Sequence, residues 1–210
     1  MKNWQIKRSD LMTLEEWKAF RAFLNRQVER ADKRASWTAV QDRAICLLAA
    51  WTGLRRSEIA DLKQGDLYLR NDNPFLVVEN GKGGKRGEVL LIPAARALLK
   101  TFLRQQEEAG FENGPQMPLF RSQRGKYTGN GIYRVWATAL ALAGLPMRSI
   151  HKARHLYAMT LYRESGYNLR LVKEQLRHTR ITTTEVYTTV TDDAAEEALA
   201  EAGNVLAGNT

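Results

Sequence analysis

The first apolar pattern of the chain has the period of a helix and follows a polar opening segment. Thr13 is followed three residues later by Glu16, which is the spacing of a capping box at a helix N-terminus. Apolar residues then recur at helical spacing and share one face, namely Trp17, Phe20, Leu24 and Val28. The pattern predicts an amphipathic helix that directly follows a short basic arm over residues 1–10.

Two further helices are predicted before the pattern changes. The second helix is predicted over about 38–52, around the apolar run AICLLAAW, and Gly53 is a plausible stop for it. A short third helix is expected over 55–62. Cys46 is the only cysteine and lies inside the apolar run. We therefore expect a buried small hydrophobe, with neither a disulfide nor a thiolate metal site.

Short runs of β-branched and apolar residues follow at 67–70, 74–79 and 88–93. They predict a small antiparallel sheet in which the last two strands flank a positively charged hairpin loop at 81–87. A long loop is expected over 110–127. Helices are expected over 94–109, 129–143, 151–165, 168–177, 181–188 and 192–202. The predicted fold class is mainly α with a small three-stranded antiparallel β-sheet, in one domain.

The charge of the chain points to a class of partner. The formal net charge is +9 and the isoelectric point is about 9.8. The segment 192–210 holds five acidic residues and no lysine or arginine, so residues 1–191 carry a net charge of +14. A body this basic favours a polyanionic partner, because binding to phosphates releases counterions. On charge alone, a basic protein without a nucleic-acid role remains open.

No segment of the sequence directs the chain to a membrane. The opening MKNWQIKRSD lacks the apolar stretch of a secretory signal. No apolar run reaches about 18 residues, the length of a membrane-spanning helix. Together with the single cysteine, this predicts a cytoplasmic protein without a membrane partner, and a nucleic-acid partner, if the charge indicates one, would add association with the nucleoid.

The candidate chemistry begins with the histidines, because the chain has only three. His151 and His155 lie in HKARH, where helical spacing puts them on one face with Arg154. His178 lies in LRH, and Tyr187 stands nine residues further along the chain. Two histidines beside an arginine, followed by a third histidine and a tyrosine, are residue types that act on phosphate esters.

Two upstream segments extend this set. TGLRRSE places Arg55 directly after a helix–glycine–helix junction and Glu58 one turn further on, and the hairpin carries Lys82. Arginine forks match a phosphate, and histidine or lysine can move protons near it. A tyrosine hydroxyl becomes a nucleophile when cations lower its pKa. Such a set could cleave a phosphodiester without metal, and the sequence lacks the dense acidic cluster of a two-metal nuclease.

Each feature also has an ordinary explanation. An Arg-x-x-Glu pair is most often a solvated ion pair on a helix. Gly-Lys-Gly is usually a plain turn, and a tyrosine near a C-terminal helix is usually a packing residue. Spacing does not prove that these segments meet in space, so the interpretation depends on their joint order.

That order resembles the tyrosine recombinase, or phage integrase, family over about residues 11–202. TGLRRSEIADL resembles the first arginine box of the family, and GKGGKRGEVLLIP resembles its lysine hairpin. HKARH resembles the second box, and LRHTRITTTEVYTTV resembles the third box with its nucleophile. The resemblance implies the tyrosine recombinase catalytic-domain fold over 11–191. It also implies an acidic C-terminal helix and tail over 192–210, packed in cis or exchanged between protomers.

The resemblance implies a role for each phosphate-binding residue. Arg55 and Arg154 would clamp the scissile phosphate. His151 and His178 would bind its non-bridging oxygens, and His151 would assist proton transfer from the nucleophile. Arg56 competes with Arg55, but the box places the catalytic arginine directly after Thr-Gly-Leu.

The remaining roles concern bond breaking and support. Lys82 would be the general acid for the departing 5′-hydroxyl, with Lys85 as its competitor, and Tyr187 would form the 3′-phosphotyrosyl link. Glu58 and His155 would support the site from behind. No cofactor or metal is expected. Candidate DNA-binding residues are Lys85, Arg86, Arg121, Arg124, Lys126 and Arg177.

Two departures from the family pattern stand out. Arg177 occupies a position where the third box normally has glycine. If that position needs a positive φ or a close approach to DNA, Arg177 would disturb it, or it could add a phosphate contact; we expect tuned rather than abolished activity. Only about ten residues precede the catalytic domain. This resembles the short single-domain recombinases, and a fragment of a longer chain fits the sequence equally well.

The functional hypothesis is a site-specific recombinase that cleaves and rejoins double-stranded DNA. The resemblance implies a homo-oligomer, from dimer to tetramer, on DNA, with accessory DNA-bending proteins as possible partners. Two alternatives are open. One is a DNA-binding regulator that keeps the fold with little activity, and the other is a relaxing enzyme of the type IB topoisomerase kind.

Overall fold

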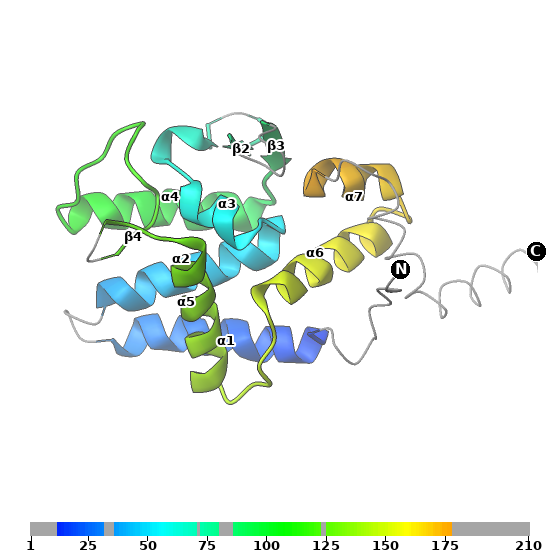
Figure 1. Ribbon diagram of the computed structural model, residues 1–210, viewed down its shortest axis with the longest axis horizontal. Coiled ribbons are helices and arrows are strands. Elements are labelled where there is room, and N and C mark those ends of the chain that lie inside the picture. The colour runs from blue at the N-terminus through cyan, green and yellow to red at the C-terminus, as the bar shows by residue number, and fades with distance from the viewer. Residues whose placement is uncertain (1–11, 32–35, 71, 80–85, 123–124, 178–210) are drawn as a thin grey trace, which may run out of the picture.

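The computed structural model describes residues 12–31, 36–70, 72–79, 86–122 and 125–177. Within these ranges the chain is mainly helical, with a small sheet at one edge (Figure 1). The helices are α1 (Leu14–Arg30), α2 (Ser36–Thr52), α3 (Arg56–Asp61), α4 (Pro93–Glu108), α5 (Gly129–Leu142), α6 (Ile150–Glu164) and α7 (Leu169–Leu176). The helices predicted over 181–188 and 192–202 and the arm over 1–10 lie outside the described residues.

The start of α1 confirms the predicted capping box. The Glu16 N–H donates to Thr13 Oγ1 over 3.1 Å, and the Thr13 N–H donates to Glu16 Oε2 over 2.8 Å. Trp17, Phe20 and Leu24 are buried, as the periodicity predicts. Local sequence therefore determines both where this helix begins and which face it packs inward.

Helix α2 runs through the centre of the molecule and contacts α1, α4, α5 and α6. Every residue from 44 to 50 is buried, including Cys46, whose burial was predicted. A helix that is apolar on all sides needs neighbours on all sides. This requirement places the end of α2, and the glycine junction after it, against α6.

The sheet confirms the predicted three antiparallel strands, although each is shorter than expected. Strands β1 (Leu67–Tyr68), β2 (Phe75–Val78) and β3 (Gly87–Leu90) lie in the order β1-β2-β3. Leu76 pairs with Val89, and both side chains are fully buried. The prediction that the third strand continues to residue 93 is wrong. Proline suits the first position of a helix, so α4 begins at Pro93.

The predicted loop over 110–127 contains a second, two-stranded hairpin. Strand β4 (Arg121–Ser122) pairs antiparallel with β5 (Gly125–Lys126). The segment before it is tied to the body, because the Leu119 N–H donates to the Leu62 carbonyl over 2.8 Å. Strands of two residues show no alternating pattern, which is why the sequence did not indicate them.

Helix α6 connects two apolar clusters. Its first turns pack on the main core, whereas Ala158 and Tyr162 pack with Val172 and Leu176 of α7 in a separate small cluster. Figure 1 shows α7 at the far end of α6, beside β3. This arrangement brings the end of α7 close to the sheet and to the junction after α2. Among the described residues, no helix is both long and apolar enough to cross a membrane.

Candidate active site

The junction after α2 depends on a glycine. Gly53 has a φ of +61°, and a Cβ there would lie 2.8 Å from Tyr157 Cδ1 and 2.9 Å from Leu176 Cδ2. A side chain at this position would therefore be strained by the backbone and blocked by both α6 and α7. The sequence predicted Gly53 as a helix stop, and the structure adds that it permits three segments to approach closely.

Arg55 and Glu58 form an ion pair whose carboxylate is buried, whereas their spacing alone is more typical of a solvated pair. Arg55 caps α3 with its backbone, and its N–H donates to Glu58 Oε2 over 2.7 Å. Its Nη1 donates to Glu58 Oε1 over 2.6 Å. The Arg55 side chain is 24% exposed, whereas the Glu58 side chain is only 2% exposed. The carboxylate thus holds the guanidinium from behind and leaves part of it open to a ligand.

Burial would raise the pKa of the Glu58 carboxyl. The positive charge of Arg177, the Arg55 N–H and the charge of Arg55 together outweigh it, so the pKa lies below its ordinary value. The carboxylate is therefore ionised at neutral pH and can serve as a fixed negative support between two guanidinium groups.

Arg154 is buried and bridges the other two boxes. Its Nη1 donates to the Gly53 carbonyl, and its Nη2 donates to the Leu176 carbonyl over 2.5 Å. The residue is only 1% exposed. One guanidinium from α6 thus joins the first arginine box to the end of α7, where the third box begins.

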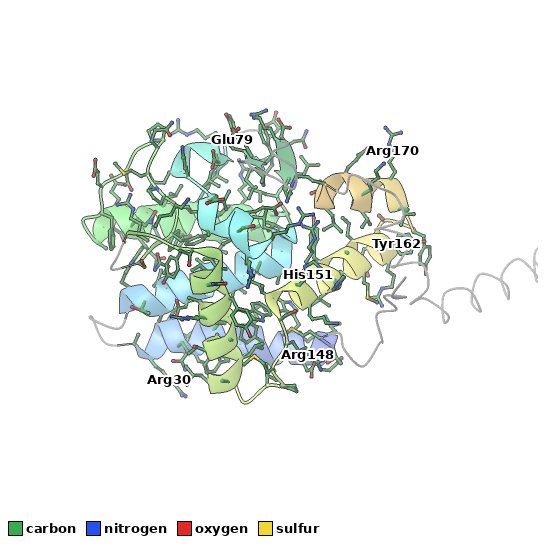
Figure 2. The ribbon with its side chains drawn as sticks, in the orientation of Figure 1. Arg30, Glu79, Arg148, His151, Tyr162 and Arg170 are labelled. Carbon is green, nitrogen blue, oxygen red and sulfur yellow. The ribbon has the colours of Figure 1, made fainter. Side chains whose placement is uncertain are left out.

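His151 lies at the N-terminal end of α6, near the middle of the molecule (Figure 2). It borders a surface pocket of about 220 Å³. The lining residues are Leu54, Arg55, Arg56, Ser57, Ile150 and His151. The two candidate arginines of the first box, Arg55 and its competitor Arg56, therefore face the same small pocket as the first histidine of the second box.

The two histidines of HKARH lie edge to face, with ring centroids 4.7 Å apart. Desolvation lowers the pKa of His151, and the charges of Arg154, Arg55 and Lys152 lower it further. Burial, followed by the charges of His151, Lys152 and Arg154, lowers the pKa of His155 to about 3. His155 is accordingly neutral at physiological pH and lies behind His151 on the same face of α6.

Arg177 adopts a positive φ, one of the two possibilities that the sequence left open for this glycine-like position. It ends α7 with φ 53° and ψ 44°, in the left-handed region. Its Nη2 donates to Glu58 Oε2 over 2.6 Å, and its side chain is 11% exposed. The contact with Glu58 was not predicted, because 119 positions separate the two residues.

The other candidate DNA-binding residues within the described ranges are surface residues or are paired. Arg86 contacts Glu79 over 3.3 Å, and Lys126 contacts Asp61 over 2.6 Å. Arg121 donates to the Glu112 carbonyl and lies near the Phe111 ring. These contacts place the Arg121 side chain against its own loop.

A further ion pair, which the sequence did not indicate, supports α6 from outside the boxes. Arg148 Nη2 donates to both carboxylate oxygens of Glu16, over 2.8 and 3.1 Å. Trp136 Nε1 donates to the Arg148 carbonyl over 2.8 Å. The segment that enters α6 is thereby fixed to the first turn of α1. The sequence signal was limited to a basic residue, Arg148, three positions before His151.

Five predicted site residues fall outside the described residues. They are Lys82, Lys85, Arg124, His178 and Tyr187. The described part of the site therefore consists of Arg55, Glu58, His151, Arg154, His155 and Arg177. These side chains come from the first arginine box, from the second box and from Arg177, the residue that precedes His178.

Comparison with known proteins identifies the family. The sequence model of the phage integrase family matches residues 12–194. The chain therefore belongs to the phage integrase family, as its motifs indicated.

Curated relatives are tyrosine recombinases. The tyrosine recombinase XerA of Pyrococcus furiosus is 31% identical over 169 residues, which cover 80% of this chain and 56% of the relative. The tyrosine recombinase XerD of Oceanobacillus iheyensis is 34% identical over 157 residues, which cover 73% of this chain and 51% of the relative. The chain thus spans about half the length of the curated relatives it matches.

Solved structures show the same fold. The XerH site-specific recombinase, in a post-cleavage complex with a palindromic difH substrate, has a TM-score of 0.73 and 26% identity. That match covers 92% of this chain and 53% of XerH. A crystal structure of XerA recombinase has a TM-score of 0.71 at 24% identity, covering 91% of this chain and 64% of XerA, and it supports the fold alone. The predicted tyrosine recombinase catalytic-domain fold is confirmed.

Proposed function

We propose that this chain is a site-specific DNA recombinase that cleaves and rejoins double-stranded DNA through a 3′-phosphotyrosyl link on Tyr187. The observation that carries the proposal is the pocket that Leu54, Arg55 and His151 line, one residue from Gly53, whose carbonyl accepts from the Arg154 guanidinium. Family membership and the similarity to tyrosine recombinases support the same activity.

In the proposed reaction, the Tyr187 hydroxyl oxygen forms a bond to phosphorus and the bond to the 5′ oxygen breaks. Arg55, Arg154 and His178 stabilise the negative charge on the non-bridging oxygens. Lys82 gives a proton to the departing 5′ oxygen. Rejoining is the reverse reaction with an incoming 5′-hydroxyl, so the phosphotyrosyl bond conserves the energy of the phosphodiester.

His151 is suited to a second role in this scheme. Its lowered pKa keeps the imidazole neutral at physiological pH, so it can accept a proton as well as donate a hydrogen bond. We propose that it binds a phosphate oxygen and assists the transfer of the tyrosine proton.

The assembly on DNA belongs to the same proposal. We expect two to four copies of the chain on DNA, with the segment 192–210 either exchanged between protomers or packed on its own domain. The basic charge over 1–191 would draw the chain to the nucleoid, and accessory DNA-bending proteins could assist.

Covalent capture tests the proposal. A randomised pool of nicked duplexes is incubated with the protein, adducts are isolated on denaturing gels, and the enriched sequence is rebuilt as a suicide substrate. We expect an adduct with the wild-type chain and with the control Tyr68→Phe, an exposed tyrosine on the sheet, and none with Tyr187→Phe. DNA binding without any wild-type adduct would favour the regulator. Relaxation of supercoiled DNA without strand exchange between two sites would favour the topoisomerase.

A further inference from the structure

Arg177 lies where three segments of the candidate site meet. Its backbone ends α7, directly before His178 in the chain. Its side chain crosses to the first arginine box and contacts Glu58 over 2.6 Å. Both side chains are largely buried, with 11% of Arg177 and 2% of Glu58 exposed. The Arg177 guanidinium is therefore directed into the protein, toward Glu58, the carboxylate that holds Arg55.

The path of the Arg177 side chain depends on a glycine in the sheet. A Cβ on Gly87 would lie 2.5 Å from Arg177 Cδ and 3.2 Å from its Cγ. Gly87 begins β3, at the base of the hairpin that carries Lys82 in sequence. The absence of a side chain at Gly87 thus leaves the space through which Arg177 reaches Glu58.

Arg177 shares the carboxylate that holds Arg55. Glu58 Oε2 accepts from both the Arg55 N–H and Arg177 Nη2, and Oε1 accepts from Arg55 Nη1. Bonds to both oxygens fix the plane of the carboxylate, and with it the direction of the Arg55 guanidinium. Because two guanidinium groups share one negative charge, Arg55 also keeps net positive charge for an anion.

Two features of Arg177 cost free energy, which points to a role besides stability. Its left-handed backbone is strained for a residue other than glycine. Its buried Nε has no hydrogen-bond partner among the described residues. Strain and an unsatisfied donor next to a candidate active site are typical of functional positions.

We propose that Arg177 is a positioning residue that orients Arg55 through Glu58, in place of a direct contact with DNA. The inference rests on the proposed function, because Arg55 points toward a scissile phosphate only if the chain cleaves DNA. It assigns a specific task to the arginine that stands where the family pattern has glycine.

The test measures cleavage rate and DNA affinity separately, on the suicide substrate defined above. Arg177→Gln should lower the rate of adduct formation at saturating DNA by about tenfold to a hundredfold, because a charge-assisted bond is lost. Its Kd for the duplex and the salt dependence of that Kd should stay at the wild-type values. Arg177→Lys, which retains the charge, should recover part of the rate. An unchanged rate in Arg177→Gln would overturn the inference.

The matched control is Arg170→Gln. Arg170 lies on the same helix, is 87% exposed, pairs only with Glu174 among the residues that the structure describes, and points away from the body in Figure 2. It removes one positive charge without touching Glu58, so its adduct rate should equal that of the wild type. A Kd that weakens in Arg177→Gln, with a salt slope reduced by about one, would mean a phosphate contact and overturn the inference.

A double substitution tests whether Arg177 acts through Glu58. In a Glu58→Gln background, Arg177→Gln should slow adduct formation by less than about twofold, because residues acting as one unit are not additive. Fully additive losses would overturn the inference. Arg177→Gly serves as a second variant, since glycine relieves the left-handed backbone and keeps the fold. It should show the same rate loss as Arg177→Gln, and wild-type activity in it would equally overturn the inference.

The two proposals fail in different ways. If the wild-type chain forms no adduct on the selected site, the proposed function is wrong and the inference falls with it. If the wild-type chain forms a Tyr187-dependent adduct and the Arg177 variants match it, only the inference is wrong.

Discussion

Arg55 and Arg154 have the same proposed task but are held by different kinds of partner. The Arg55 side chain is 24% exposed, and its guanidinium is held by the carboxylate of Glu58. The Arg154 guanidinium is buried, and its bonds to the carbonyls of Gly53 and Leu176 hold it to the backbone. Arg55 is thus positioned by the charge of Glu58, which is shared with Arg177 and is lost on protonation. Arg154 is positioned by two main-chain carbonyls, which are within its reach because the glycine junction lies close to α7.

The difference predicts how each region fails. Loss of the Arg154 contacts separates the boxes, because two buried carbonyls lose their donors. Loss of the Glu58 charge weakens its bonds to Arg55 and Arg177 but leaves in place the bonds of Arg154 that join the boxes. Mutations in the Arg154 region should therefore affect stability and activity together, whereas mutations around Arg55 should affect activity more than stability.

The largest expected effect is that of Arg154→Ala. Two buried carbonyls would be left without donors, so we expect the free energy of unfolding to fall by about 4 kcal/mol. The rate of adduct formation should fall by about a thousandfold, the loss typical of a main charge-stabilising donor. Urea denaturation and the suicide substrate measure the two quantities. Arg163→Ala, at an exposed position of the same helix, should change stability by less than about 0.5 kcal/mol.

Gly53→Ala tests the close packing of the glycine junction against α6 and α7 without removing a charge. The added Cβ meets Tyr157 and Leu176 below 3.0 Å, and the backbone φ is +61°. We expect a loss of about 3 kcal/mol from the strained backbone and the overlap together. The control Gly110→Ala has a φ of +77° and no atom within 4 Å of its new Cβ, so it should lose only about 1 kcal/mol. Equal losses in both variants would refute the close approach at Gly53.

Glu58→Gln tests the charge that holds Arg55. We expect a loss of about 2 kcal/mol in the free energy of unfolding near neutral pH. The folded pKa of Glu58 lies below its ordinary 4.5, so its stabilisation is present above that value and is lost as pH falls through the folded pKa. The gap between wild type and variant should therefore narrow in acid. A loss as large as that of Arg154→Ala would break the comparison between the two arginines.

Near neutral pH, the smallest effect on stability is expected from His155→Asn, because the effect of this variant appears in acid. The folded pKa of His155 is about 3 and its ordinary value is 6.5, so the unfolded chain binds the extra proton between these values. Wild-type stability should fall as pH drops through this window, and the variant should show a shallower decline. Denaturation midpoints over a pH series measure the slope. Identical slopes would show that His155 takes up its proton equally well in both states.

Local patterns were sufficient to predict most elements of the fold. The capping box at Thr13 and the apolar face after it define α1 by contacts within a few residues, and Pro93 begins α4 by its own backbone geometry. The strand β3 was predicted too long because the apolar run continues past the last paired residue. The hairpin of β4 and β5 was missed because two-residue strands show no period.

The sequence by itself determined the residue types of the candidate site, their order and the family to which the chain belongs. The family pattern marked position 177 as one where glycine is normal, but it left open whether the position needs a positive φ or a close approach to DNA. Only the tertiary structure decided that Arg177 reaches Glu58 and that Gly87 leaves space for it. The physical reason is distance along the chain. Capping and periodicity report contacts within a turn or two, whereas the contact between Glu58 and Arg177 spans 119 positions and exists only once α3, α7 and β3 have packed together.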